Sequence, residues 1–267
     1  MSQSDSRTQQ AAAYIARQVE ARAPIDIMAQ AFVPRTIEEA YAVQSTALNL
    51  LAETQGPVGG YKVASTNPAS RQRTGVSGPC ASGILARQIS PAPATLNSAD
   101  YHQFCIECEV GVRLAADLDA AGAPYTRSSV AGAIDSLAVS FELIDRLEAA
   151  TGSGPFAPDI KSISTFANAG AVVGEPVTDW HNLDLAAALG VMTINGEVVS
   201  EGPGSNVMGH PLESLAWLAN LKVEQGEALR AGMLILTGTL TSLMPLNAGD
   251  TATISIEGLG EAQLELT

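Results

Sequence analysis

The stretch "CIECEVGVRL", residues 105–114, carries two glutamates and one arginine in a run that is otherwise free of charge and alternates like a β-strand. One face of such a strand is entirely apolar and predicts a core contact, whereas Glu107 and Glu109 share the other face. From the strand rise, their Cα atoms lie roughly 7 Å apart. Either this face is solvated, or the two carboxylates converge on one hard cation, because Mg²⁺ and Mn²⁺ prefer oxygen ligands.

Two further charged residues stand in apolar surroundings. Glu142 lies in "AVSFELI", and a buried glutamate needs a partner, which is either a cation shared with Glu107 and Glu109 or a salt bridge to a basic residue. Lys62, in "GGYKVAST", is one of only three lysines. It either guards a sheet edge or acts as a general acid/base whose pKa is lowered by burial or by nearby charge.

The order of the expected elements favours a mixed fold. Helical patterns cover residues 8–22 and 37–54, the second with a capping box from Thr36 to Glu39. Strands and hairpins dominate from residue 59, including a type I′ turn at Asn195-Gly196, whereas "GPCASGIL" is expected to form a loop. We therefore expect an α+β fold with a mixed, mainly antiparallel β roll. An N-terminal helical segment, 1–58, packs as one unit with a β-rich catalytic domain, 59–267.

Composition excludes several classes of function. The 267 residues carry a net charge of −14 with no basic run, which argues against nucleic-acid binding. No apolar stretch is long enough to cross a membrane and the polar start lacks a signal-peptide pattern, so we expect a cytoplasmic protein. An anionic substrate would need local positive charge, which a bound cation supplies. Cys105 and Cys108 match C-x-x-C, but on a strand they point to opposite faces, and zinc would need a second pair.

Five segments carry a resemblance to a known family. The sequence resembles the 2-keto-4-pentenoate hydratase and 4-oxalocrotonate decarboxylase family, within the fumarylacetoacetate hydrolase superfamily, from about residue 35 to the C-terminus. The segments are "GGYKVASTNPASRQRTGVSGPCASGIL", "CIECEV", "FELID", "NGEVVSEGPGSNVMGHPLESLAWLAN" and "GMLILTGTLTSLMPLNAGD".

The resemblance implies a β roll with an N-terminal helical part, assembled into homo-oligomers. It also implies a divalent metal, Mg²⁺ or Mn²⁺, held by Glu107, Glu109 and Glu142, with Lys62 as the acid/base. Thr237 and Thr239 look like substrate contacts by the same comparison.

Two segments depart from the family pattern and are expected to border the substrate. Ser164-Thr165-Phe166 stand where many relatives have Asp-Asn-Ala, which makes Ser164 a candidate substrate contact. Asp145-Arg146 stand where relatives often have Asp-Ser-Arg. The expected activity is that of a lyase, a hydratase that adds water to a 2-hydroxydienoate to give a 4-hydroxy-2-oxo acid, in the catabolism of aromatic or related compounds. The alternatives are a 2-oxo acid decarboxylase, an acylpyruvate-type C–C hydrolase, and a non-catalytic partner subunit.

Overall fold

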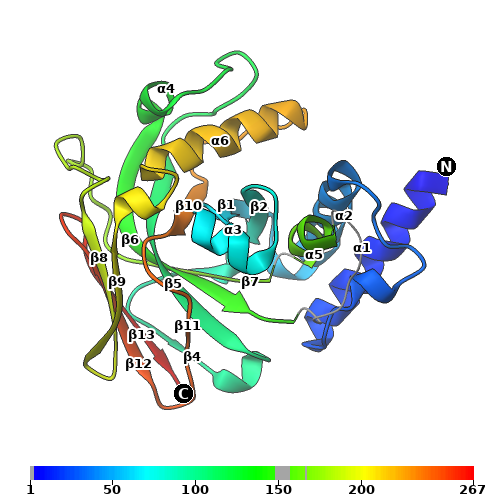
Figure 1. Ribbon diagram of the computed structural model, residues 1–267, viewed down its shortest axis with the longest axis horizontal. Coiled ribbons are helices and arrows are strands. Elements are labelled where there is room, and N and C mark those ends of the chain that lie inside the picture. The colour runs from blue at the N-terminus through cyan, green and yellow to red at the C-terminus, as the bar shows by residue number, and fades with distance from the viewer. Residues whose placement is uncertain (1–2, 148–156, 166) are drawn as a thin grey trace.

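Two long neighbouring strands form the centre of the protein (Figure 1). They are β5 (Phe104–Leu114) and β6 (Ile134–Asp145), which pair antiparallel along most of their length. The computed structural model describes residues 3–147, 157–165 and 167–267. The stretch of alternating residues that carries Glu107 and Glu109 is therefore a strand, as expected, and the structure places it in the middle of the larger sheet.

The larger sheet contains eight strands in the order β2-β1-β10-β5-β6-β7-β3, with β11 paired to β5. Only β1 with β10 and β3 with β7 are parallel, so the expectation of a mixed, mainly antiparallel sheet is confirmed. Its other strands are β1 (Val58–Ala64), β2 (Cys80–Leu85), β3 (Ile89–Pro91), β7 (Asn168–Val173), β10 (Leu234–Thr239) and β11 (Met244–Pro245).

The smaller sheet has five strands in the order β4-β13-β12-β8-β9. Asn195 and Gly196, with φ of 52° and 83°, make the turn between β8 and β9, as the Asn-Gly signal indicates. The strands are β4 (Ala94–Leu96), β8 (Leu189–Ile194), β9 (Glu197–Pro203), β12 (Thr251–Ile256) and β13 (Gly260–Leu266).

The two faces of the larger sheet have different roles. The apolar face of β5, with Ile106, Cys108 and Val110, belongs to the main core together with Ile254 and Leu264 of the smaller sheet. Each of the isoleucine, valine and leucine side chains contributes roughly 1.5–3 kcal/mol when fully buried. The core thus fixes the register of β5 and turns Glu107 and Glu109 toward the opposite face.

That opposite face is concave because the sheet curls without closing into a barrel. Its two ends approach each other where Asn168 Nδ2 of β7 donates to the Gly83 carbonyl of β2 at 3.0 Å. A small apolar cluster of Ile84, Ala171, Leu234 and Leu236 occupies the inside of the curl. Side chains on this inner face converge, so residues on distant strands can meet there.

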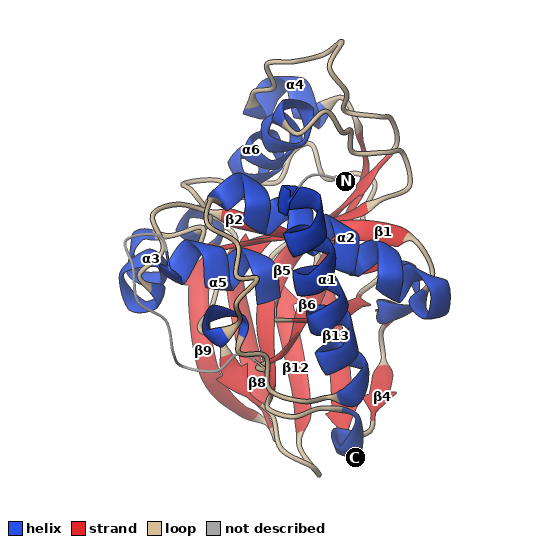
Figure 2. Cartoon of the chain, turned by 90° about the vertical axis from the view of Figure 1, so that its right-hand side faces the viewer, coloured by secondary structure: helices blue, strands red, loops and turns tan. Residues whose placement is uncertain are grey.

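Helices cover the outer strands (Figure 2). α1 (Gln3–Ala21) and α2 (Ile37–Gln55) pack together in a separate apolar cluster that includes Leu85 of β2. Thr36 caps α2 by accepting from the Glu39 amide at 3.2 Å, while the Glu39 carboxylate accepts from the Arg35 amide. The helical N-terminal part is confirmed, and its division from the β-rich part at residue 58 stays a prediction.

The remaining helices lie around the same sheet. His210 caps α6, since its Nδ1 accepts from the Leu212 amide at 3.1 Å, and Pro211 takes the first helical position. The helices are α3 (Pro68–Thr74), α4 (Arg127–Ala131), α5 (Ala157–Thr165) and α6 (Pro211–Glu224). None of the helices in the described ranges has both the length and the apolar character that a membrane crossing requires.

One local expectation is wrong. The segment "GPCASGIL" was expected as a loop, but its last six residues form the buried strand β2. Small residues have low intrinsic strand propensity, and here tertiary packing overrides it. At Gly83 a Cβ atom would come within 2.7 Å of Leu48 Cδ1, so the absent side chain lets α2 lie directly on the strand.

Candidate metal centre and active site

The three glutamates that the sequence singles out lie together on the concave face. Glu107 of β5 is directly opposite Glu142 of β6, and Glu109 pairs with Ser140 one step along. One carboxylate oxygen from each glutamate lies within 4.8 Å of the other two. Strand alternation and antiparallel register are therefore sufficient to bring the three carboxylates to one point.

Burial makes this cluster costly without a counter-charge. Glu109 is 0% exposed and Glu142 is 1% exposed. Burial, followed by the charges of Glu142 and Glu107, raises the pKa of Glu109 well above its ordinary value. The Gly238 amide opposes this, because it donates to Glu109 Oε2 at 2.7 Å.

The donor set fits a hard divalent cation. Glu109 Oε1 and Glu142 Oε2 are buried and accept no hydrogen bond from the described residues. Two such oxygens facing each other need either a shared proton or a cation. Carboxylate oxygens at this separation are the ligands that Mg²⁺ and Mn²⁺ prefer.

Lys62 joins the same cluster from β1. Its Nζ lies 2.8 Å from Glu142 Oε1, and the lysine is only 6% exposed. Burial alone lowers the pKa of Lys62, but the Glu142 carboxylate and weaker contributions from Cys80 and Glu107 raise it by more, so the net direction is upward. The lowered pKa that the sequence analysis expects for an acid/base lysine is therefore wrong for this site without a bound cation. The salt-bridge alternative for Glu142 and its place in the carboxylate cluster are thus both realised.

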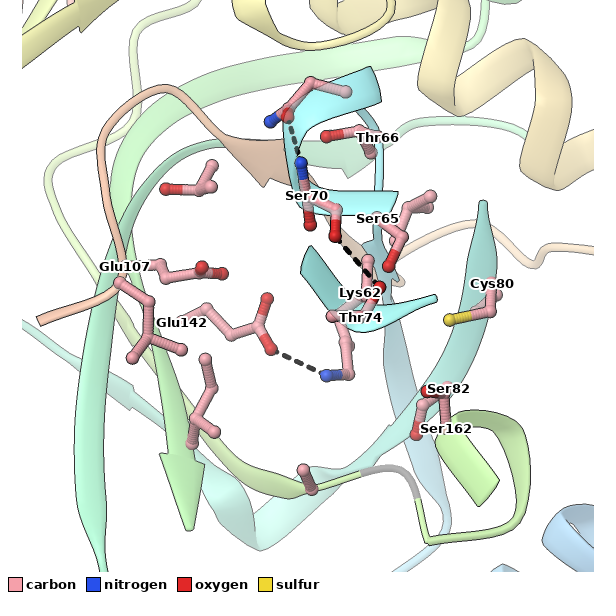
Figure 3. A pocket seen from close by; sticks show the side chains of 18 of the residues that line it. Lys62, Ser65, Thr66, Ser70, Thr74, Cys80, Ser82, Glu107, Glu142 and Ser162 are labelled. Carbon is pink, nitrogen blue, oxygen red and sulfur yellow. Dashed lines mark hydrogen bonds and ion pairs between the residues drawn. The ribbon is translucent and has the colours of Figure 1, made fainter. Parts of the chain in front are cut away.

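A cavity of about 600 Å³ opens beside the cluster. Figure 3 shows Lys62 reaching toward Glu142, with Glu107 next to it and the hydroxyls of Ser65, Ser70 and Ser82 around the cavity. The backbone of Ser65 has a φ of 58°, which non-glycine residues seldom adopt. A polar wall beside an acidic cluster suits a small, polar, anionic ligand paired with a cation.

The three expected substrate contacts have different positions. Thr239 lines the cavity, and its hydroxyl donates to the Thr241 carbonyl at 3.1 Å. Thr237 is fully buried, and its hydroxyl donates to the Val110 carbonyl at 2.9 Å. Ser164 is also fully buried, while its neighbours Ser162 and Thr165 face the cavity. Contact with a substrate stays a prediction for all three.

Sequence reasoning missed two contributions to this site. The Gly238 amide supports Glu109 directly, and the only signal was the glycine between Thr237 and Thr239. Lys161 lines the cavity from α5, a helix that was not expected. The one feature of the sequence that singled out Lys161 was the scarcity of lysine.

A curled, mixed β-sheet that gathers three glutamates and a lysine beside one cavity defines a β-rich class of protein with a candidate carboxylate metal centre. The chain belongs to the fumarylacetoacetate (FAA) hydrolase family, whose C-terminal domain matches residues 63–267. The resemblance noted from the sequence is therefore confirmed.

Proteins similar to this chain include two different enzymes. A 2-hydroxyhexa-2,4-dienoate hydratase of Comamonas testosteroni is 33% identical and covers 87% of each chain. A 4-oxalocrotonate decarboxylase of Pseudomonas putida is 32% identical and covers 84% of this chain and 83% of its own. The structure of a 4-oxalocrotonate decarboxylase from Pseudomonas putida G7, complexed with magnesium and adipate, superposes with a TM-score of 0.88 at 28% identity, covering 98% of each chain.

Proposed function

We propose that the protein is a divalent-metal-dependent hydratase, a hydro-lyase that adds water to a 2-hydroxydienoate to give a 4-hydroxy-2-oxo acid. The observation that carries the proposal is the buried contact between Lys62 and Glu142, inside a cluster of carboxylates that opens on a cavity. Relatives named as hydratases, at about the same identity as the decarboxylases, support it. The natural role is then a step in the catabolism of aromatic or related compounds.

Glu107, Glu109 and Glu142 would hold the cation, with Mg²⁺ or Mn²⁺ as candidates. When bound, such an ion supplies Lewis acidity toward the carboxylate and 2-oxo oxygens of a 2-oxo acid. The three glutamates would set where the carboxylate and 2-oxo end of the substrate binds, because all three are anchored in the centre of the sheet. Gly238 keeps one Glu109 oxygen engaged and so fixes its carboxylate plane.

Lys62 is the proposed acid/base, since its Nζ borders both the cluster and the cavity. In the hydration reaction, the dienol loses its hydroxyl proton as C5 gains one, which leaves a C3–C4 double bond conjugated to the 2-oxo group. Water then adds its hydroxyl at C4, and C3 gains a proton. A buried ammonium that exchanges protons with these carbons would account for both transfers.

The substrate contacts are part of the same proposal. Thr239 borders the cavity and would meet the substrate directly. Thr237 and Ser164 are assigned as substrate contacts as well. Because both are fully buried, they would reach it only if the cavity wall moves on binding.

A decarboxylase is the second candidate, favoured by the full-length likeness to 4-oxalocrotonate decarboxylase. The metal-loaded protein is incubated with a panel of 2-hydroxydienoates, 4-oxalocrotonate and acylpyruvates, and products are identified by mass. A hydratase yields the substrate plus one water, and a decarboxylase yields the substrate minus CO₂. Turnover that survives complete chelation of metal would overturn the proposal, and the absence of any product would favour a partner subunit.

We further propose that the protein is cytoplasmic and acts as a homo-oligomer, as the family resemblance implies. Light scattering of the purified chain gives the subunit number. A monomer at micromolar concentration would contradict the second point.

A further inference from the structure

Thr66 lines the cavity with a buried hydroxyl that has no hydrogen-bond partner among the described residues. Ser82 and Thr165 are also buried in the cavity wall. Their hydroxyls donate to backbone carbonyls, at 3.3 Å to Gly83 and at 2.9 Å to Lys161. Thr66 is only 3% exposed, and Figure 3 shows its hydroxyl directed into the cavity. Because buried hydroxyls are almost always hydrogen-bonded, a molecule bound in the cavity is needed to complete this one.

Thr66 lies at the glutamate end of the cavity, next to Gly238 of β10. A Cβ atom on Gly238 would come within 2.6 Å of Thr66 Oγ1, so the hydroxyl lies directly against this glycine. The Gly238 amide in turn donates to Glu109 Oε2 at 2.7 Å. A single residue therefore separates Thr66 from a proposed metal ligand, and a molecule held by the glutamate cluster comes within reach of its hydroxyl.

The backbone on both sides of Thr66 is held in place. Ser65 has a φ of 58°, and its carbonyl accepts from Arg71 Nη1 at 3.0 Å. Such a backbone angle is uncommon outside glycine and persists where the surrounding contacts hold it. On the other side Asn67 caps α3, because its Oδ1 accepts from the Ser70 amide at 2.7 Å. The Thr66 side chain is thus presented to the cavity by a turn that is fixed at both ends.

The chemistry around Thr66 favours an anionic oxygen as its partner. The amide of Thr66, like its hydroxyl, donates to no described residue, so Thr66 offers two donors. A 2-oxo acid has three oxygens at its acid end, two in the carboxylate and one in the 2-oxo group. If a cation engages the 2-oxo oxygen and one carboxylate oxygen, the other carboxylate oxygen needs a donor. A hydroxyl suits it, because hydrogen bonds to charged acceptors are roughly twice as strong as neutral ones.

We propose that the Thr66 hydroxyl binds the carboxylate of the 2-oxo acid substrate, at the oxygen that the cation does not engage. This rests on the proposed function, which places the acid end of the substrate at the glutamate cluster. Thr66 then contacts the substrate directly and orients its carboxylate, and with it the direction in which the carbon chain leaves the cluster. The contact applies equally to hydration and decarboxylation, because it involves only the end that both kinds of substrate share.

Substitutions at Thr66 test the role of the hydroxyl. Thr66→Val keeps the shape of the side chain without the hydroxyl, Thr66→Ser keeps the hydroxyl, and Thr66→Ala replaces the valine variant if valine disturbs the turn. Calorimetry in the presence of Mg²⁺ measures the affinity for 2-oxopentanoate, a saturated 2-oxo acid that cannot be hydrated. Loss of a hydrogen bond to a charged group predicts binding at least about tenfold weaker in Thr66→Val. Thr66→Ser should stay close to the wild type, and the affinity for Mg²⁺ alone should not change in either variant.

Infrared spectroscopy identifies the ligand atom that Thr66 contacts. 2-Oxopentanoate labelled with ¹³C at C1 or at C2 gives separate bands for the carboxylate and the 2-oxo group. The carboxylate band of the bound ligand should move between the wild type and Thr66→Val, while the 2-oxo band stays in place. Thr74→Val is the matched control, because Thr74 lines the same cavity but its hydroxyl donates to the Ser70 carbonyl at 2.9 Å. This control should change neither the affinity nor the two bands.

The outcomes separate the two proposals. The Thr66 proposal is overturned, and the proposed function stands, if Thr66→Val binds 2-oxopentanoate as the wild type does. The same holds if Thr66→Ser loses as much affinity as Thr66→Val, or if only the 2-oxo band moves. If the wild type loaded with Mg²⁺ does not bind 2-oxopentanoate, the proposed function fails and the Thr66 proposal fails with it.

Discussion

Lys62 Nζ lies 2.8 Å from Glu142 Oε1, although β10 and β5 separate their two strands in the order of the sheet. Neighbouring strands are about 4.8 Å apart, so a flat sheet would hold the two backbones about 14 Å from each other. The curl of the sheet brings the two side chains together on the concave face. This contact links the proposed acid/base to the proposed metal ligands, and it gives Glu142 a partner when no cation is bound.

Replacing Lys62 with methionine should separate proton transfer from metal binding. The change leaves Glu142 buried without its cationic partner, so the metal-free variant should lose about 3 kcal/mol of unfolding free energy. Mg²⁺ should restore much of that loss, and its affinity should stay near normal. Proton exchange at the substrate C3 or C5 in D₂O should collapse, as followed by NMR.

Lys222→Met is the matched control for that variant. Lys222 is also a buried lysine, 3.1 Å from Glu227, but it does not line the cavity beside the glutamates. Its loss should destabilise the fold without affecting exchange at the substrate carbons. Persistent exchange in Lys62→Met would move the acid/base role to another residue.

Glu107→Gln should weaken metal binding and turnover together. The amide keeps the shape of the side chain but removes one of the three negative charges at the cluster. Because even groups behind the ligands change metal affinity 10- to 100-fold, we expect a loss of at least about that size. Mn²⁺ titration followed by electron paramagnetic resonance measures it, with Glu201→Gln on the exposed side of β9 as control. Unchanged titration curves would refute the ligand assignment.

The sequence predicts those parts of the fold that depend on local pattern. Alternation in residues 105–114 gives the central strand, Thr36 marks the start of α2, and Asn195-Gly196 gives the hairpin. The strand β2 escapes prediction because its residues are small, and only their burial under α2 makes the segment extended.

In the candidate site, too, local pattern predicts some features, and others depend on contacts between distant segments. Glu107 and Glu109 follow from alternation alone, and Glu142 from its apolar surroundings. That Glu142 pairs with Glu107 depends on the register between β5 and β6, and that Lys62 reaches them depends on the curl. Register and curvature arise from contacts between distant segments, which a single sequence does not display.

The cap of α6 should make stability depend on pH. Burial and the charge of Arg127 lower the pKa of His210, against smaller opposing effects of Glu213 and Asp184, and its neutral Nδ1 accepts from the Leu212 amide. With the folded pKa below the unfolded value of about 6.5, the unfolded chain binds the proton first. The stability from this cap is thus present above about pH 6.5 and is lost as the pH falls through the folded pKa.

His210→Asn tests that dependence, because asparagine caps helices without titrating. Between about pH 7.5 and pH 5.5, the wild type should lose about 0.5–1 kcal/mol more unfolding free energy than the variant, a range that allows for solvent screening of a half-buried group. Urea unfolding followed by circular dichroism measures both. Parallel losses in the two proteins would show that His210 titration does not matter to the fold.

Gly238→Ala should damage the glutamate cluster through the backbone. Gly238 has a φ of 116°, its amide donates to Glu109 Oε2, and a Cβ atom there would come within 2.6 Å of the Thr66 side chain. Alanine should shift this turn, lower the unfolding free energy by about 1–3 kcal/mol and weaken Mn²⁺ binding severalfold. Gly209→Ala is the control, since its φ is 85° but, apart from its chain neighbours, no atom of the described residues lies within 4 Å of the added carbon. Equal metal affinity in the two variants would mean that the Gly238 amide does not position Glu109.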